Sequence, residues 1–205
     1  MKMNIYGASG HAKVIIDIAN SIDIPIDTIF DDNLQLTEVS GHPVIHELSK
    51  ELLIRGTVLA IGDNKIRKLV AKKFDGKFQK GIFHSSAVLA PTVIIGEGTV
   101  VMANASINAE VIIGNHCIIN TGATVEHECQ IGDYVHISPN SALAGDVIVG
   151  EGSHIGIGAV VIPGVKIGKW VTIGAGAVVL EDIPDFAVVV GNPGKIIKYN
   201  HLENE

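Results

Sequence analysis

The chain has 205 residues, and 47% of them are hydrophobic, so it can bury a core without disulfide bridges or a structural metal. Its formal net charge of −7 argues against nucleic acid or an anionic membrane surface as a partner. The N-terminal residues lack the long apolar run and cleavage site of a signal peptide, so we expect a cytoplasmic protein that is not inserted in a membrane.

The first eighty residues alternate between strand and helix patterns. Helices are predicted near residues 11–20 and 64–73, and strands at residues 3–6, 26–30, 57–61 and 78–83. This alternation is typical of a small parallel sheet flanked by helices. We therefore predict a Rossmann-like α/β domain over residues 1–84.

Two loops of this domain suggest a nucleotide site. Residues 7–11 (GASGH) join the first strand to the first helix, where backbone N–H groups and the helix dipole can hold a phosphate. This loop is shorter than the full dinucleotide fingerprint. Asp31 and Asp32 follow the second strand, where a carboxylate commonly contacts a nucleoside, although isolated acids there are more often plain turn residues. Together the loops favour a single nucleotide over NAD.

An aliphatic residue recurs at every sixth position from Leu89 to Val179. The series is Leu89, Ile95, Val101, Ile107, Ile113, Ile119, Val125, Ile131, Ile137, Leu143, Val149, Ile155, Val161, Ile167, Ile173 and Val179. Four residues after most of them stands a small or β-branched residue. This period is the signature of a parallel β-helix. We predict such a helix over residues 85–184, with both series facing its core, followed by a tail over 185–205.

The two cysteines, Cys117 and Cys129, fall in the series of small residues. They are too few for a disulfide framework and lack metal-ligand spacing. We therefore expect buried, reduced thiols.

The tripeptide Glu126-His127-Glu128 is unusual because it interrupts a sequence built from Val, Ile, Gly and Ala. The repeat places it at a surface corner, between residues 108–110 of the preceding coil and 144–146 of the next. Gly145 then follows His127 by one coil and has no side chain to fill the space beside the imidazole. We expect a ligand there; the alternative is a solvated corner residue.

Positive charge is absent between Lys80 and Lys166. An earlier group of basic residues precedes this stretch, and a later group includes Lys166, Lys169 and Lys195. The earlier group also fits the solvated face of a helix. Two separated basic zones suit two anionic ligands, and the later one could hold the phosphates of a ligand whose reactive end reaches His127.

The combined motifs resemble the hexapeptide-repeat acyltransferases of the sialic-acid O-acetyltransferase type, and among them the bacterial N-acetyltransferases of UDP-4-amino-4,6-dideoxy sugars in the bacillosamine pathway. The resemblance is carried by IYGASGH (5–11), FDD (30–32), AIGDNKIRK (60–68), INTGATVEHECQIGD (119–133), LAGDVIVG (143–150) and VGNPGK (190–195). It implies a left-handed, three-sided β-helix and a homotrimer with active sites between subunits. Gly194 departs from the commoner ending, GxPAK, which has alanine there.

The resemblance also assigns roles to residues. His127 would be the catalytic base and Glu128 its partner, although spacing alone leaves open whether Glu126 or Glu128 contacts the ring. The acceptor substrate would contact Gly7, Ser9, Gly10, His11, Asp31, Asp32, Asn64, Arg67 and Asn120. The co-substrate, acetyl-CoA, would contact His136, Gly145, Lys166, Lys169 and Lys195, with Asn120 and His136 lining the acyl site.

The implied reaction is direct acetyl transfer from acetyl-CoA to the amino group of a UDP-linked amino-dideoxy sugar. A histidine of pKa near ~6.5 can accept the amine proton at neutral pH. A backbone amide near Gly145 is a candidate donor to the oxyanion. Because both cysteines are predicted to face the core, an acyl-enzyme is not expected.

Three other functions compete with this interpretation. The first is O-acetylation of a sialic-acid hydroxyl, and the second is a non-catalytic scaffold that binds a nucleotide sugar. The third is a zinc carbonic anhydrase on the same prism, which the four prism histidines suggest. That family uses a His-x4-His pair, whereas successive gaps here are eleven, nine and eighteen residues, so no metal is expected; the histidines are His116, His127, His136 and His154.

Overall fold

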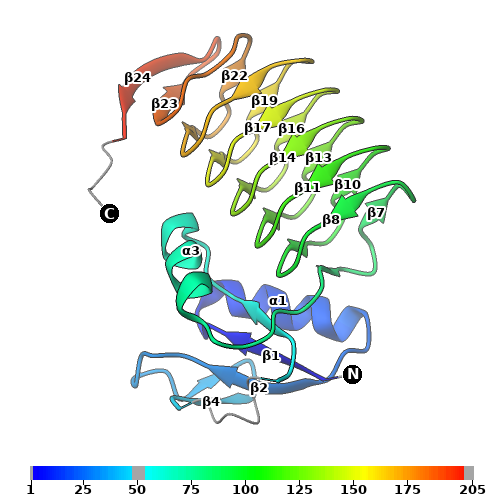
Figure 1. Cartoon of the computed structure of the whole chain (residues 1–205), viewed down its shortest axis with the longest axis vertical. Helices are drawn as coiled ribbons and strands as arrows, with labels where there is room; N and C mark the ends of the chain where they lie inside the picture. The colour runs from blue at the N-terminus through cyan, green and yellow to red at the C-terminus, as the bar shows by residue number, and fades with distance from the viewer. Residues whose placement is uncertain (1, 48–53, 201–205) are drawn as a thin grey trace.

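The computed structural model describes residues 2–47 and 54–200 and contains an N-terminal α/β unit followed by a prism of short strands (Figure 1). The α/β sheet has the order β3-β4-β2-β1-β5. Its strands are β1 (Met3–Tyr6), β2 (Ile26–Phe30), β3 (Glu38–Val39), β4 (His42–Ile45) and β5 (Thr57–Leu59). Strands β4, β2, β1 and β5 run parallel, as predicted, while β3 is antiparallel to β4.

Two helices lie where the sequence pattern predicts them, α1 (Gly10–Ser21) and α3 (Asn64–Lys73). Helix α1 buries an apolar face along its length, which explains its periodicity. Helix α3 begins after Asp63, whose side chain accepts a hydrogen bond from the Ile66 N–H at 2.8 Å. This N-cap bond fixes the start of α3. None of the helices in residues 2–47 and 54–200 is long and apolar enough to span a membrane.

The prism has three sheets of parallel two-residue strands. The first prism sheet holds β6 (Ile82–Phe83), β9 (Val100–Val101), β12 (Ile118–Ile119), β15 (His136–Ile137), β18 (His154–Ile155) and β21 (Thr172–Ile173), extended by β23 (Ala187–Val190) and the antiparallel β24 (Lys195–Tyr199). The second holds β7 (Val88–Leu89), β10 (Ser106–Ile107), β13 (Thr124–Val125), β16 (Ala142–Leu143), β19 (Val160–Val161) and β22 (Val178–Val179). The third holds β8 (Ile94–Ile95), β11 (Ile112–Ile113), β14 (Gln130–Ile131), β17 (Ile148–Val149) and β20 (Lys166–Ile167).

The six-residue period describes the interior of the prism correctly. Paired strands are one coil of eighteen residues apart, as in the pairing of Ile118 with His136. The aliphatic series from Val101 to Val179 is buried, and Leu89 and Ile95 pack partly against it. The core of the prism is therefore the stacked series that the sequence predicts.

The predicted strand at residues 78–83 is wrong as a single element. Phe78 makes one bridge to Thr57 of the α/β sheet, whereas Ile82–Phe83 is already the first strand of the prism. Phe83 stands six residues before Leu89, so the period begins with an aromatic residue that an aliphatic pattern overlooks. The prism therefore extends beyond the predicted 85–184 at both ends, since β23 pairs parallel with β21.

The α/β unit packs on the outer face of the first prism sheet. Apolar residues of α1 form one cluster with Ile82, Val100 and Ile118, which are the outward-facing first residues of β6, β9 and β12. Helices α1 and α3 lie between the α/β strands and the coils (Figure 1). The first prism sheet is thus covered within the chain.

Candidate active site

The turn that contains His127 lies at the prism corner that faces away from the α/β unit. Residues 126–129 connect β13 of the second prism sheet to β14 of the third. In a three-sided prism the corner between two sheets lies opposite the remaining sheet, which here is the one that carries the α/β unit. The side chains of His127 and Glu128 are 58% and 59% exposed.

His127 is held by the carboxylate of Glu128, whose Oε2 lies 2.9 Å from the imidazole Nδ1. This contact selects Glu128 over Glu126, which spacing alone leaves open. A carboxylate accepts a hydrogen bond, so the pair places the ring proton on Nδ1 and leaves the Nε2 lone pair free. Glu128 itself adopts a left-handed backbone with φ 63°.

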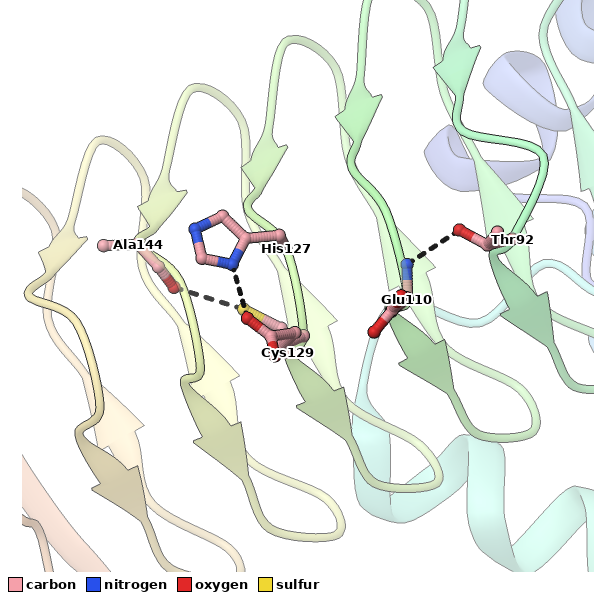
Figure 2. A network of polar contacts seen from close by, with 6 residues as sticks. Thr92, Glu110, His127, Cys129 and Ala144 are labelled. Carbon is pink, nitrogen blue, oxygen red and sulfur yellow. Dashed lines mark hydrogen bonds and ion pairs between the residues drawn. The ribbon is translucent and has the colours of Figure 1, made fainter.

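The imidazole of His127 fills the space over Gly145 in which the repeat pattern predicts a ligand. A Cβ atom on Gly145 would lie 2.5 Å from the His127 Cε1, so the ring leans directly over this glycine. Figure 2 shows His127 projecting from its coil toward the coil that contains Ala144, with Glu110 one coil on the other side. Gly145 therefore makes room for the ring and not for a ligand, and a ligand must approach from the exposed side.

The backbone N–H of Gly145 is available to donate a hydrogen bond to a ligand. Within residues 2–47 and 54–200 its N–H has no hydrogen-bond partner, whereas its carbonyl accepts from the Gly164 N–H at 3.0 Å. The free N–H lies on the turn over which the His127 ring leans. It is a candidate donor to a developing oxyanion.

Neither cysteine is available as a nucleophile. Cys117 and Cys129 are completely buried, as predicted. The Cys129 Sγ donates to the Ala144 carbonyl at 3.2 Å (Figure 2). Burial raises the pKa of the Cys117 thiol to about 12 and also raises the pKa of Cys129. Both thiols stay protonated and inside the prism.

Asn120 and His136 meet at the opposite side of the prism. The Asn120 Nδ2 lies 3.0 Å from the His136 Nε2, and the Thr121 N–H donates to the Asn120 Oδ1 at 2.8 Å. The His136 ring stacks on His154 with centroids 4.7 Å apart, as its position one coil earlier predicts. Burial, followed by the proximity of His154, lowers the pKa of His136 to about 3.

The four prism histidines do not gather around one point. His127 lies at the corner between the second and third prism sheets, while His136 and His154 lie on the first. Over residues 2–47 and 54–200 no group of three or more His, Cys, Asp or Glu side chains is arranged to hold a metal. The residues therefore do not form the ligand set that the carbonic anhydrase alternative requires.

The loops at the carboxyl ends of β1 and β2 are tied together by Asp31. Its Oδ2 accepts from the Ala8 N–H at 2.7 Å, and its Oδ1 accepts from the Asn33 N–H at 2.8 Å. Gly7 adopts φ 107°, and a Cβ there would lie 2.8 Å from the Ala60 carbonyl oxygen, so the turn requires glycine. The predicted nucleotide loop is thus preformed, with Ser9 and Gly10 exposed on it.

Asp32 and His11 complete this part of the predicted site. The exposed Asp32 accepts from the Tyr6 hydroxyl at 2.7 Å, and burial, together with this acid, raises the pKa of Tyr6. Burial, followed by the charge of Arg67, lowers the pKa of His11 to about 4. The His11 Nε2 is buried without a hydrogen-bond partner in the described structure. Tyr6 is a residue of this site that the sequence analysis missed, because a tyrosine at the end of a strand has no distinguishing pattern.

Asn64 and Arg67 lie at the junction of α3 with the prism. The Asn64 Nδ2 donates to the carbonyls of Gly152 and Ser153, and Arg67 is 1% exposed. The polar groups of both side chains are taken up by the protein itself. This differs from the expectation that they hold the acceptor substrate directly.

The three late lysines do not converge on one point. Lys166 is exposed on β20 of the third prism sheet, and Lys195 is exposed on β24 of the first. Lys169 stands on the turn between β20 and β21. All three lysines lie toward the C-terminal end of the prism.

A shallow groove of about 260 Å³ lies on the third prism sheet beside the His127 turn. Its lining is Ile112, Gln130, Ile131, Gly132, Ile148 and Val149. Lys166 follows Gln130 and Ile148 in the same outward column. The groove thus lies on the strand that follows the His127 turn and on the same sheet as Lys166, an arrangement that suits an apolar arm ending in phosphates.

Both the α/β unit and the prism match known protein families. The PglD N-terminal domain family matches residues 2–74, and the bacterial transferase hexapeptide repeat matches four overlapping segments within residues 92–181. A UDP-N-acetylbacillosamine N-acetyltransferase of Bacillus subtilis is 41% identical over 108 residues, which are 48% of this chain and 50% of that protein. The chain thus aligns with about half the length of this curated relative.

Two solved structures align over nearly the whole chain. A perosamine N-acetyltransferase mutant from Caulobacter crescentus, in complex with CoA and GDP-perosamine, has a TM-score of 0.91 and 41% identity, covering 97% of each chain. The acetyltransferase domain of PglB from Neisseria gonorrhoeae has a TM-score of 0.88 and 37% identity, covering 96% of this chain and 99% of that one. With its PglD-type N-terminal domain and left-handed β-helix, the chain belongs to the hexapeptide-repeat acyltransferases, in the branch that contains bacterial sugar N-acetyltransferases.

Proposed function

We propose that this protein transfers the acetyl group of acetyl-CoA to the amino group of an amino sugar linked to a nucleoside diphosphate. The observation that carries the proposal is the alignment, over 97% of both chains, with an N-acetyltransferase bound to CoA and GDP-perosamine. The exposed His127–Glu128 pair supplies the base that such a transfer needs. The relatives are named N-acetyltransferases, which favours an amine acceptor over the hydroxyl of a sialic acid.

The chemistry follows from the proton positions at the pair. Glu128 accepts the Nδ1–H of His127, so the Nε2 lone pair takes a proton from the amine as its nitrogen attacks the thioester carbonyl. The carboxylate stabilises the imidazolium that forms. The Gly145 N–H is our candidate donor to the oxyanion. Collapse of the tetrahedral adduct breaks the C–S bond, and the departing thiolate of CoA takes up the proton from Nε2.

The site requires more than one subunit. His127 lies at the corner opposite the first prism sheet, whereas the loops of Asp31 and Asp32 belong to the α/β unit packed on that sheet. One chain therefore keeps its base away from its own nucleotide loops. We propose a homotrimer in which the His127 corner of one prism faces the α/β unit and Asn120 of its neighbour.

Exposed apolar side chains on the other two prism sheets support this assembly. Val88 and Val160 stand outward on the second sheet, and Ile94 and Ile112 on the third, with Ile94 61% exposed. Such columns on a lone chain favour association because burial removes their apolar surface from water. The same third sheet carries the groove that we assign to the pantetheine arm of acetyl-CoA, with Lys166 toward its phosphates.

The acceptor sugar could be linked to either of two nucleotides, UDP or GDP. We place a UDP-linked 4-amino-4,6-dideoxy sugar first, on the strength of the segments that resemble the bacillosamine enzymes. The GDP-perosamine bound by the Caulobacter enzyme makes a GDP-linked sugar the direct competitor. The preformed loop at residues 7–11 and the carboxylate of Asp32 are suited to either nucleotide.

Acetyl transfer tests the proposal directly. Purified protein is mixed with acetyl-CoA and, in turn, a UDP-4-amino-4,6-dideoxy sugar, GDP-perosamine or sialic acid, and CoA release is followed with a thiol reagent. Since both protein cysteines are buried, they give little background. Turnover with a nucleotide amino sugar, and a mass gain of one acetyl group on that sugar, is expected. Turnover with sialic acid alone, or binding of nucleotide sugars without turnover, would overturn it.

A further inference from the structure

The peptide that joins Ala144 to Gly145 is held from inside the prism. The Cys129 Sγ donates a hydrogen bond to the Ala144 carbonyl at 3.2 Å (Figure 2). Cys129 is completely buried, and burial raises the pKa of its thiol, so the sulfur keeps the proton that it donates. Because the sulfur belongs to the core of the prism, the Ala144 carbonyl points inward.

An inward carbonyl turns the Gly145 N–H outward. Over residues 2–47 and 54–200 the one cis peptide bond is Asn192–Pro193, so the peptide between Ala144 and Gly145 is trans. The C=O and N–H groups of a planar trans peptide point in opposite directions. The N–H therefore leaves the prism at the corner where His127 stands, close to the Nε2 of that ring, since a Cβ atom on Gly145 would lie 2.6 Å from it.

Two other turns of the prism show the same pair of directions. The Thr99 Oγ1 donates to the Gly114 carbonyl from inside at 2.8 Å, and the N–H of the same peptide, on Asn115, donates outward to the Asp133 Oδ1 at 2.7 Å. A second turn repeats this arrangement with Ser153, Gly168, Lys169 and Asp185 in the same four places. In both turns a carboxylate on the next coil takes up the outward N–H.

The peptide beside His127 lacks this outer partner. The residue one coil after Gly145 is Pro163, whose side chain has no hydrogen-bond acceptor. Within the described residues the Gly145 N–H has no partner, whereas the inner bond to the carbonyl of the same peptide is present. The peptide is thus fixed on its inner side and open to a ligand on its outer side.

The donor at Cys129 is not explained by packing alone. Cys129 stands in a column of inward residues at this corner, one in each coil of eighteen residues. The other members of the column are Val93, Val111, Val147 and Val165. Valine cannot donate a hydrogen bond, yet it fills the same place in the coils before and after. The column therefore has its one donor in the coil whose hydrogen bond reaches the peptide beside His127.

We propose that Cys129 is a positioning residue, whose thiol holds the peptide between Ala144 and Gly145 with its N–H turned toward the thioester carbonyl of acetyl-CoA. The inference rests on the proposed function, in which this N–H donates to the oxyanion that forms when the amine attacks. The thiol keeps its proton throughout and takes no part in the chemistry. A donor that is already oriented stabilises the oxyanion without a rotation of the peptide during the reaction.

Two variants of Cys129 separate positioning from filling of space. Cys129→Val removes the donor and introduces the residue that the neighbouring coils have. It should lower kcat about tenfold and change the KM for either substrate less than about threefold, because the donor acts on the transition state. Cys129→Ser keeps a donor of the kind that Ser153 provides, and it should retain kcat within about threefold. A cysteine that only fills space predicts native kcat in Cys129→Val.

The other buried cysteine supplies the matched control. The Cys117 Sγ donates to the Gly132 carbonyl at 3.0 Å, also fifteen residues later, but at a corner that faces the α/β unit. Cys117→Val removes the same kind of bond, and its column also contains valine, at Val135 and Val171. This variant should keep kcat within about twofold.

Raman spectroscopy of the full-length protein tests the bond without any activity, because the S–H stretch moves to lower frequency when the thiol donates. Subtracting the spectrum of Cys129→Val from that of the unaltered protein isolates the Cys129 band. We expect this band at lower frequency than the band of a free thiol in an apolar solvent. A band at the free-thiol frequency overturns the inference.

The remaining outcomes also decide. Native kcat in Cys129→Val, an equal loss in Cys117→Val, or a Cys129→Ser enzyme as slow as Cys129→Val would each contradict the positioning role. If Cys129→Val does not fold, Cys129→Ala removes the same donor and should show the same loss. If the unaltered protein transfers no acetyl group, the proposed function fails, and the Raman band still decides whether Cys129 holds the peptide.

Discussion

Mild acid should destabilise this protein, because burial lowers the pKa values of two of its histidines. His11 and His136 have folded-state pKa values of about 4 and about 3, below the value of ~6.5 in an unfolded chain. As the pH falls below ~6.5, the unfolded chain therefore binds protons that the folded chain does not. The stability that these two histidines contribute is complete above that pH and is lost progressively on acidification.

The size of the effect follows from the same values. Between pH ~6.5 and ~5.0 each of the two histidines lowers the free energy of unfolding by about 1.6 kcal/mol, so together they account for about 3 kcal/mol. His116 and His154, whose pKa values burial also lowers, act in the same direction.

Urea unfolding at fixed protein concentration, followed by circular dichroism at pH 6.5 and 5.0, measures this loss. The double variant His11→Gln and His136→Gln should lose clearly less stability over the same interval than the unaltered protein. The half-buried His84, whose ring bonds to the Ser86 hydroxyl, serves as the control for replacing a histidine, and His84→Gln should retain more of the pH dependence than the double variant. Equal stability of the unaltered protein at both pH values would refute the burial of neutral histidines on which the calculation depends.

Three further predictions concern the transfer reaction. His127→Ala should lower kcat by about 10² to 10⁴ with the fold intact, and Glu128→Gln should cost far more activity than Glu126→Gln; equal, near-native rates in His127→Ala and Glu128→Gln would show that another group takes the proton. Gly145→Ala should lower kcat by roughly 10², because its Cβ displaces the His127 ring, and native kcat would contradict the packing. Three lysines are replaced by alanine one at a time: Lys166, Lys169 and Lys195. In each variant the KM for acetyl-CoA should rise more than the KM for the sugar, and an unchanged KM for acetyl-CoA in all three would exclude these lysines from the CoA site.

The sequence predicts what depends on local repetition. The six-residue period identifies the inward positions of the prism, places both cysteines in its core and brings His127 to a corner. The helix predicted at residues 64–73 likewise follows from a local sequence pattern, and the structure has it from Asn64 to Lys73. These features depend on neighbours in the sequence or on a fixed step of eighteen residues.

What the sequence misses depends on contacts between distant elements. The burial of Arg67 exists only because α3 meets two coils of the prism, and charged residues in a short helix ordinarily suggest a solvated face. The His127 ring lies over Gly145 because of its side-chain rotamer, and the six-residue spacing of the sequence does not predict a rotamer. The short hairpin β3–β4 turns at Ser40 and Gly41, both with positive φ, and its two-residue strand is too brief for a period to register.

Subunit complementation tests the central claim, a site shared between chains, most directly. One inactive variant, His127→Ala, and a second, Asp31→Ala with Asp32→Ala, are co-expressed with different tags, and the mixed oligomers are isolated. Every mixed trimer has three interfaces, and one of them joins an intact base to intact nucleotide loops, so about a third of the native kcat should return. If the base and the nucleotide loops of one chain formed a complete site instead, the mixed oligomers would be no more active than the two variants measured separately.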